Sequence, residues 1–317
     1  MTFREALRAR AAGARARLVF PEGDDPRVRE AAAELERLEI AVPRLLDPTA
    51  MPGLDDPVVR AVGERLRTRR PQAVRDGLHA LELAVDPLRF GAGLVAIGAA
   101  DGCIAGAVAA TSEVLRAALW LIGARDGIPT ITAAMYHGLP DGRVLTYTDV
   151  AVVPAPTVEQ LVAAAEAAAD DRRALVGDDP VVAFLSFSTR GSATGPEVER
   201  VRAAAEAFAA RRPDVVSDGE LQLDAALVPE VARRKCPDSP VAGRATVLVF
   251  PSLDAANIGY KLTERLAGAS AAGPLLQGLA RPMSDLSRGA TPDDIVDVAA
   301  MVALQARAAP PRPLEES

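Results

Sequence analysis

Short apolar runs alternate with longer Ala-rich segments through most of the chain. The short runs are continuously apolar, which is typical of strands that are buried on both faces of a parallel sheet. We predict such strands at Arg17–Pro21, Gly93–Gly98, Thr130–Ala133, Val150–Val153, Val181–Phe187, Val215–Ser217 and Ala245–Phe250.

The segments between these runs carry helical patterns. Several of the predicted helices begin at a clear signal, as at Asp25-Pro26, Pro156-Thr157 and Gly195-Pro196, where a boundary residue stands beside Pro or a cap. The predicted helices are Pro26–Leu38, Gln72–Val85, Ser112–Ile122, Thr157–Ala169, Pro196–Arg211, Leu221–Arg234 and Gly259–Ala267. The alternation of strands and helices predicts an α/β fold with parallel sheets.

The length of 317 residues suits two domains or one large α/β domain. Composition shifts at Tyr136–Gly142, a loop-like segment, and at Gly273-Pro274 suggest where a second domain begins and ends. We therefore expect residues 135–274 to form one α/β domain, and residues 1–134 with 275–317 to form the other. Residues 310–317 are polar and Pro-rich, and we expect them to be a frayed tail.

Charge and composition exclude several function classes. The formal net charge of −7 argues against general binding of nucleic acids, which requires a basic face. Two cysteines and two histidines are too few and too scattered for a disulfide framework or a metal cluster, so we expect no metal and a reducing cytoplasmic location. We expect no secretory leader and no membrane association, because the basic N-terminus lacks an apolar core and no run approaches the roughly 20 apolar residues of a membrane span.

The richest chemistry lies in Ser284–Asp294, where a hydroxyl, a guanidinium, a glycine and several carboxylates precede an apolar helix. Such a turn can hold an anion on backbone N–H groups and Arg288 while a carboxylate handles a proton. The same residues also predict a helix start, with Thr291 as the N-cap, Pro292 at the first position and Asp294 completing a capping box. A cap does not require the preceding Asp-Leu-Ser-Arg-Gly run.

Two further strand-to-loop passages could face an anionic ligand. Ser188 and Arg190 follow a predicted buried strand, and ligands bind beyond the carboxyl ends of parallel strands. Asn257 could cap a helix, from which Lys261 could face an anion. The alternatives are an ordinary loop for the first passage and a solvated lysine for the second. Glycine-rich signatures of Rossmann or P-loop nucleotide binding are absent from the sequence.

Taken in order, these segments resemble the phosphate acetyltransferase (phosphotransacetylase) family. The resemblance extends from about Leu18 to Gln305. Its motifs are PEGDDPRV, ADGCIAGAV, EVLRAAL, YTDVAVVPAPTVEQL, LSFSTRGSA, DGELQLDAAL, GRATVLVFPSLDAANIGYKL and GPLLQGLARPMSDLSRGATPDDIV. LSFSTRGSA with DGELQLDAAL favours the acetyl enzymes over the phosphate butyryltransferase branch and over the domain that is fused to malic enzymes.

The resemblance implies two three-layer α/β/α domains with a cleft between them, related in fold to isocitrate and isopropylmalate dehydrogenases, and a homodimer. It implies reversible transfer of an acetyl group between CoA and inorganic phosphate through a ternary complex, with acetyl phosphate as the other product and no cofactor. It assigns the base that takes the thiol proton to Asp294, with Asp293 as the competing candidate. Ser287 would lie near the sulfur, with Arg288 as a cation beside it.

Further substrate contacts follow from the same resemblance. Arg116 would hold phosphate. Arg67 is the nearest equivalent of a family arginine that precedes the Asp-Pro motif, and Arg69 or Arg70 could serve instead. The remaining residues expected to bind substrate are Thr111, Ser188, Arg190, Asn257 and Lys261.

The chain departs from the family pattern at Ala109 and Ala110, where two polar residues are usual. Larger space beside these alanines would suit an enzyme that prefers propionyl or butyryl groups. Loss of the polar groups would also suit a non-catalytic paralogue that binds CoA. Both alternatives stay open at this point.

Overall fold

The computed structural model describes residues 1–308, so the predicted C-terminal tail lies outside the described residues. The chain divides into two compact units. Unit 1 comprises residues 1–7 and 124–280, and unit 2 comprises residues 8–123 and 281–317. The main segment of unit 1, 124–280, is longer at both ends than the predicted domain of residues 135–274. The predicted boundaries cut through β4 (Thr132–Gly138) and β9 (Ser270–Gln277), which pair along their lengths and so belong to one sheet.

Unit 2 is built on a four-stranded parallel sheet in the order β10-β3-β1-β2. Its strands are β1 (Ala16–Phe20), β2 (Ala41–Leu45), β3 (Gly102–Ala105) and β10 (Met283–Asp285). Its helices are α2 (Pro26–Arg37), α3 (Pro57–Arg69), α4 (Gly77–Ala84), α5 (Pro87–Ile97), α6 (Thr111–Ala117), the π-helical turn η1 (Ala118–Ile122) and α12 (Pro292–Ala308).

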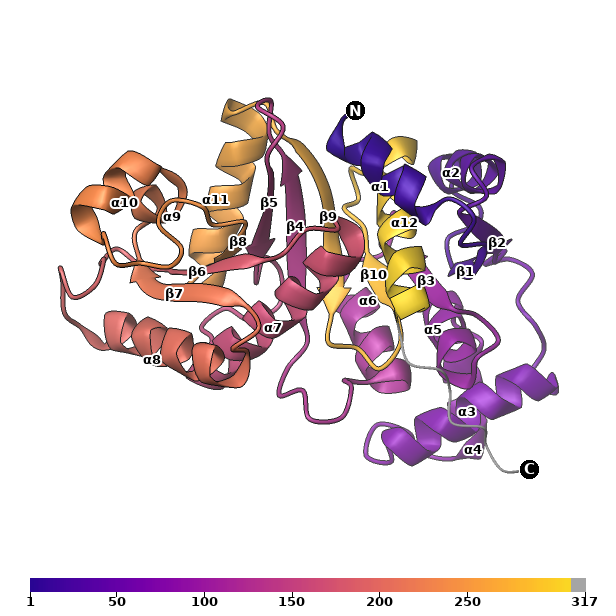
Figure 1. Cartoon of the computed structure of the whole chain (residues 1–317). Coiled ribbons are helices and arrows are strands. Elements are labelled where there is room, and N and C mark those ends of the chain that lie inside the picture. The colour runs from indigo at the N-terminus through magenta and orange to yellow at the C-terminus, as the bar shows by residue number, and fades with distance from the viewer. Residues whose placement is uncertain (309–317) are drawn as a thin grey trace. The chain divides into compact units, whose positions relative to one another are not determined.

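Helices cover both faces of this sheet (Figure 1). A Cβ at Gly102 would meet Val302 of α12, whereas the Cβ of a residue at position 91 in α5 would meet the sulfur of the next strand residue, Cys103. Successive strand residues point to opposite faces, so α12 and α5 lie on opposite sides. α2 packs beside α12. Unit 2 is therefore a three-layer α/β/α unit, as predicted.

Unit 1 contains a six-stranded sheet in the order β7-β6-β8-β5-β4-β9. Its remaining strands are β5 (Val144–Thr148), β6 (Val181–Leu185), β7 (Val216–Leu221) and β8 (Val247–Val249). Its helices are α7 (Val158–Leu175), α8 (Pro196–Arg211), α9 (Leu223–Leu227), α10 (Pro229–Lys235) and α11 (Leu253–Leu266), and α1 (Phe3–Ala11) begins in this unit. The sheet is mixed, since β4 pairs antiparallel with β5 and β9, which corrects the prediction of wholly parallel sheets.

Two predicted strands are wrong, and each has a local cause. Gly93–Gly98 belongs to the end of α5, which starts at the N-cap Asp86 with Pro87 at the first position and ends at the left-handed Gly98. A helix buried on nearly all sides is apolar throughout, so its sequence looks like that of a buried strand. Val150–Val153 forms a turn because the buried Asp149 carboxylate accepts the N–H groups of residues 151, 152 and 153.

The three helix starts predicted from a boundary signal, at Asp25-Pro26, Pro156-Thr157 and Gly195-Pro196, are confirmed. The helices predicted to begin at Gln72 and Gly259 begin instead at Gly77 and Leu253. Asp25 caps α2 by accepting from the N–H of Arg27, and Pro26 occupies the first position. Thr157 forms a capping box with Gln160 at the start of α7. Among residues 1–308, no helix combines the length and apolar character needed to span a bilayer.

Candidate active site

Three loops of unit 2 meet at the carboxyl edge of its parallel sheet. They follow β1, β3 and β10, which are neighbours in the order β10-β3-β1, and they comprise residues 21–25, 106–110 and 286–291. In parallel α/β sheets ligands bind outside this edge. The third loop carries Ser287 and Arg288, both exposed to solvent.

The capping box predicted at the start of α12 is present. The N–H and the hydroxyl of Thr291 donate to Asp294 Oδ2 at 3.0 and 2.8 Å, and the N–H of Asp294 donates to Thr291 Oγ1 at 3.2 Å. The reciprocal bonds fix the Asp294 carboxylate at the helix start, where the helix dipole favours its ionised form. Just before it, the hydroxyl oxygen of Ser287 accepts from the N–H of Gly289 at 3.2 Å.

Arg27, at the start of α2, ties the loops after β3 and β10 together. Its guanidinium donates to the carbonyls of Arg288 at 2.8 Å, Ala290 at 3.1 Å and Ala107 at 2.8 Å. It also pairs with Asp25 Oδ2 at 2.8 Å, and the hydrogen bond from Arg27 lowers the pKa of Asp25. The main chain that bears Arg288 is therefore held from outside the loop.

Glu22, in the loop after β1, holds the loop after β3 by its backbone. Its Oε2 accepts from the N–H groups of Gly106 and Ala107 at 3.0 and 2.8 Å, and its Oε1 accepts from those of Val108 and Ala109 at 3.0 and 2.7 Å. The carboxylate is buried. Because these bonds involve only the main chain of the loop, the departure from the family pattern at positions 109 and 110 removes none of them.

Asp285, the last residue of β10, links this strand to α6. Its Oδ2 accepts from the hydroxyl of Thr111 at 2.7 Å, and the carboxyl is buried with 3% of the residue exposed. Burial raises the pKa of Asp285 to about 6, the hydrogen bond from Thr111 opposes this, and the nearby Glu22 adds to the rise. The substrate residue predicted at Thr111 thus contacts the strand that leads to Ser287 and Arg288.

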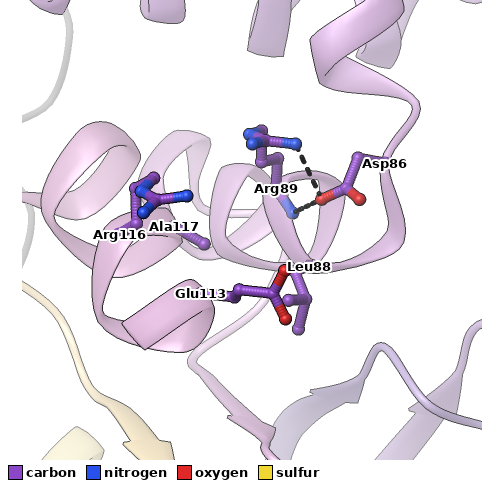
Figure 2. Close-up of a pocket in the computed structure, with 6 residues that line it drawn as sticks. All are labelled: Asp86, Leu88, Arg89, Glu113, Arg116 and Ala117. Atoms are coloured by element: carbon purple, nitrogen blue, oxygen red, sulfur yellow. Dashed lines mark hydrogen bonds and ion pairs between the residues drawn. The ribbon is translucent and has the colours of Figure 1, made fainter. Parts of the chain in front are cut away.

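Arg116 lies farther along α6, where it lines a small surface pocket with residues of the first turn of α5 (Figure 2). In this pocket the main-chain N–H of Arg89 donates to Oδ1 of the N-cap residue Asp86 at 3.0 Å. No described residue forms a hydrogen bond or ion pair with the guanidinium of Arg116 or with that of Arg288. Both cations are therefore available to an anion.

The three candidate arginines at the end of α3 have different surroundings: Arg67 and Arg69 lie in its last turn, and Arg70 is its C-cap. Arg67 pairs on the exposed face with Glu64, one helical turn away, at 3.0 Å. Arg70 donates to the carbonyl of Leu119 in η1 at 2.8 Å. Arg69 is exposed and lies close to Gly123, where an added Cβ would meet its guanidinium. The choice among them stays a prediction.

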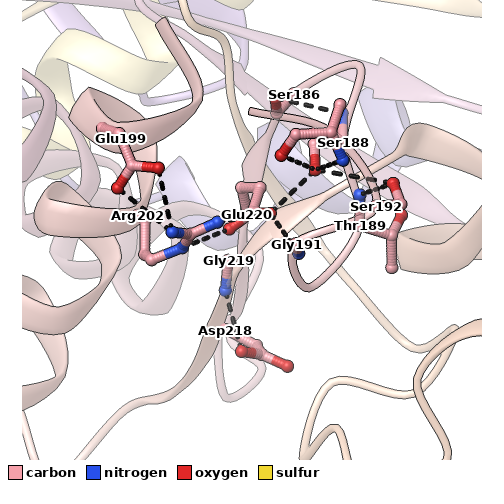
Figure 3. Close-up of polar contacts among 11 residues, drawn as sticks. Ser186, Ser188, Thr189, Gly191, Ser192, Glu199, Arg202, Asp218, Gly219 and Glu220 are labelled. Atoms are coloured by element: carbon pink, nitrogen blue, oxygen red, sulfur yellow. Dashed lines mark hydrogen bonds and ion pairs between the residues drawn. The ribbon is translucent and has the colours of Figure 1, made fainter. Parts of the chain in front are cut away.

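In unit 1 the loop that contains Ser188 and Arg190 is wrapped around the buried Glu220 (Figure 3). Glu220 Oε1 accepts from the Ser188 hydroxyl at 2.9 Å and from the N–H of Gly191 at 2.8 Å, and Arg202 donates to both carboxylate oxygens. Burial raises the pKa of Glu220, but hydrogen bonds from Arg202, Gly191 and Ser188 outweigh it and lower the pKa to about 2.

This network occupies the polar groups that were expected to meet substrate in unit 1. The Ser188 hydroxyl is fully buried, and Arg190 pairs with Asp218 at 2.6 Å. On α11 the ammonium of Lys261 donates to Asn257 Oδ1 at 2.6 Å, so these two residues form a pair on the helix surface. Whether any of the four contacts substrate stays a prediction.

Residues 2–303 match the phosphate acetyl/butaryl transferase family. A phosphate acetyltransferase of Treponema pallidum is 39% identical and aligns with 96% of this chain and 99% of its own length. One from Thermoanaerobacterium thermosaccharolyticum is 40% identical, with 92% and 95% covered. The chain belongs to this family.

Solved structures agree with the family assignment. A phosphotransacetylase from Streptococcus pyogenes superposes with a TM-score of 0.90 and is 35% identical, covering 98% of this chain and 100% of its own. A phosphotransacetylase from Staphylococcus aureus gives a TM-score of 0.87 at 33% identity, with 96% and 98% covered. The resemblance recognised in the sequence is thereby confirmed, and so is the predicted α/β fold class.

The sequence alone did not reveal which residues hold the loops after β3 and β10 in place. Glu22 and Arg27 stand in the PEGDDPRV motif, which was noted only as part of the resemblance. Their partners lie 84 to 87 and 80 to 263 positions away, respectively. The available signal was a carboxylate directly after a buried strand, since a buried carboxylate requires hydrogen-bond partners.

Proposed function

We propose that this chain catalyses the reversible reaction of acetyl-CoA with inorganic phosphate to give acetyl phosphate and CoA, in a ternary complex of both substrates. The observation that carries the proposal is the loop after β10, in which Ser287 and Arg288 are exposed while Arg27 and the capping box hold the backbone. Membership of the phosphate acetyl/butaryl transferase family supports the reaction type.

The chemistry requires three tasks of the protein. A thiol has a pKa near 8.5, so a positioned base or cation is needed to supply thiolate at neutral pH. In the direction of acetyl-CoA synthesis, Asp294 takes or orients the thiol proton, and Arg288 stabilises the developing negative charge. Ser287 lies beside the sulfur and can donate to the carbonyl oxygen as it gains charge in the tetrahedral state.

Phosphate is the other reactant, and its charge persists throughout the reaction. Arg116 is the residue we assign to it, because a guanidinium can grip two oxygens at once and this one is unengaged by described residues. Thiol, carbonyl and phosphate provide all the reacting groups, so we expect that neither a metal nor a bound cofactor takes part. We also propose a cytoplasmic location, since both cysteines are free thiols.

A comparison of neighbouring carboxylates tests the assignment. Asp294→Asn keeps an oxygen that can accept the capping bonds but removes the proton acceptor, so we expect kcat to fall by roughly 10²-fold or more with the fold intact. Asp293→Asn is the matched control, because Asp293 is exposed and pairs with Arg8 at 2.9 Å. Equal rates of acetyl phosphate formation for Asp294→Asn and the wild type would contradict the role of Asp294.

The acyl preference is a separate question, because the family name covers acetyl and butyryl transfer. The small side chains of Ala109 and Ala110 favour testing longer acyl groups. We expect kcat/KM to be highest for acetyl-CoA when acetyl-, propionyl- and butyryl-CoA are compared. A higher value for butyryl-CoA would reassign the substrate, and the absence of turnover with all three would favour a non-catalytic CoA-binding protein.

We further propose a homodimer that involves α11. Ile258, Leu262 and Leu266 are four residues apart on this helix and are 60%, 51% and 79% exposed, so they form an apolar stripe. Exposed apolar stripes of this kind mark interaction surfaces. Sedimentation should give twice the monomer mass for the wild type and a monomer for Leu262→Glu. A dimer that survives this substitution would place the interface elsewhere.

A further inference from the structure

The side chains of Asp285 and Thr111 form a hydrogen-bonded pair in which one carboxylate oxygen has no partner among the described residues, a feature that anchoring β10 to α6 does not require. Asp285 Oδ2 accepts from the Thr111 hydroxyl at 2.7 Å, whereas Asp285 Oδ1 is buried and has no hydrogen-bond partner among residues 1–308. Thr111 itself is exposed, so its hydroxyl lies between a buried carboxyl and the surface. The chain continues from Asp285 directly to Ser287 and Arg288.

The charge that acts on Asp285 from a neighbouring loop is negative. Gly106, at a φ of +104°, brings the main chain so close that an added Cβ would meet Asp285 Oδ1. The nearby charged group on the β1 side is the Glu22 carboxylate. On β3 burial raises the pKa of the Cys103 thiol, which stays neutral. On α12 the buried Asp297 pairs with Arg8 at 2.6 Å.

We propose that Asp285 is a positioning residue whose protonation reverses the hydrogen bond to Thr111 and so turns the Thr111 hydroxyl into a donor for an oxyanion substrate. This inference rests on the proposed function, because it names Thr111 as part of the site for phosphate. Asp285 acts through Thr111 and does not itself touch the substrate.

The two forms of the pair differ by one proton. With Asp285 ionised, the Thr111 hydrogen is committed to Oδ2, and only the hydroxyl lone pairs face outward. When Asp285 takes a proton from solvent, its own O–H can donate to Thr111 Oγ1. The Thr111 hydrogen then rotates outward and can donate to an oxygen of the anion. Burial raises the pKa of Asp285 to about 6, so both forms are accessible near neutral pH.

Sulfate is a suitable probe, because it is an oxyanion whose charge is constant between pH 5.5 and pH 8. If only the protonated pair binds well, the apparent dissociation constant is inversely proportional to the protonated fraction, so it rises about tenfold per pH unit above the pKa. Calorimetric titration of the whole protein in two buffers of different ionisation enthalpy gives both the affinity and the proton uptake. We expect uptake of nearly one proton per sulfate at pH 7.5.

Three variants separate this proposal from a purely structural role. Asp285→Asn mimics the protonated form. We expect its amide oxygen to take the place of the partnerless Oδ1, because an unpaired carbonyl is tolerated better than an unpaired N–H. Its NH₂ group then takes the place of Oδ2 and donates to Thr111. We expect its sulfate affinity to be independent of pH and equal to that of the wild type at low pH. Thr111→Val should bind weakly at every pH, and Thr111→Ser should behave like the wild type.

The outcomes distinguish this inference from the proposed function. An Asp285→Asn protein that keeps the pH slope, a Thr111→Val protein that binds sulfate like the wild type, or a wild type that binds no sulfate would each overturn the inference. Turnover of acetyl-CoA with phosphate by the wild type would leave the proposed function standing in all of these cases. If the wild type does not turn over acetyl-CoA with phosphate, the proposed function is refuted, whatever the sulfate titrations show.

Discussion

Replacing Glu22 with glutamine tests whether the loop after β3 is held by a single carboxylate. The carboxylate accepts four N–H bonds of 2.7 to 3.0 Å, two on each oxygen. Glutamine keeps one oxygen for two of these donors and turns an NH₂ group toward the other two. We expect the amide to face Val108 and Ala109, because these residues are the more exposed and water can reach their N–H groups.

The size of the effect follows from the two donors that lose their acceptor. A buried N–H left without a partner costs about 1–3 kcal/mol, and access of water reduces this at the more exposed positions. We therefore expect Glu22→Gln to lower the free energy of unfolding by about 2–3 kcal/mol. Urea unfolding measures this loss, and hydrogen exchange followed by mass spectrometry should show faster exchange of the four amides.

A neighbouring glutamate provides the control. Glu113 accepts one N–H, that of Ala110, at 3.2 Å in an exposed setting, so Glu113→Gln should change stability by less than about 0.5 kcal/mol. If Glu22→Gln unfolds like this control and the four amides stay protected, the loop is held by something other than the carboxylate, and the reasoning is refuted.

Three further predictions follow from other contacts. Arg27→Lys should lower kcat by roughly 10–100-fold with little loss of secondary structure, because a compact ammonium lacks the planar fork with which the guanidinium spans three carbonyls. Arg29 donates to one carbonyl, so Arg29→Lys should leave kcat nearly unchanged. For Asp285 the folded-state pKa is raised from 3.8 to about 6, so the wild type loses stability as pH rises through this window. Between pH 4 and pH 7 the wild type should therefore lose about 2 kcal/mol of unfolding free energy relative to Asp285→Asn in urea titrations, and no relative change would contradict the raised pKa. For Glu220 the pKa is lowered from 4.5 to about 2, so its contribution is present above pH 4.5 and is lost as pH falls toward 2. Glu220→Gln should be less stable than the wild type at pH 7, and the gap should narrow at pH 3.

The features that the sequence predicted correctly are mostly local ones. The capping box of Thr291 and Asp294 spans three residues, and the starts at Asp25 and Thr157 depend on their nearest neighbours. Hydrogen bonds between residues so close in sequence can be predicted from the residue types alone. For the same reason the strands at the start of the chain and at Val181 could be located to within two residues.

The features that it missed depend on distant parts of the chain. Gly93–Gly98 looked like a strand because its environment, a helix packed between a sheet and other helices, is apolar on nearly every side. Val150–Val153 turns because of the buried Asp149. The roles of Glu22, Arg27 and Asp285 arise only when segments 80 or more residues apart are brought together. Residue types alone do not specify such pairings.

The Glu22 contacts have a consequence for how this site can change over time. The loop after β3 is anchored through its main chain, by four N–H groups that donate to Glu22 and by the Ala107 carbonyl that accepts from Arg27. Every residue has these main-chain groups, except that proline lacks the N–H. Side chains at positions 108, 109 and 110 can therefore be exchanged without loosening the frame that presents them. Substitutions at these positions could change the preferred acyl group during evolution, while the residues assigned to the thiol and to phosphate keep their places. The same freedom makes these three positions a rational starting library for redirecting substrate choice.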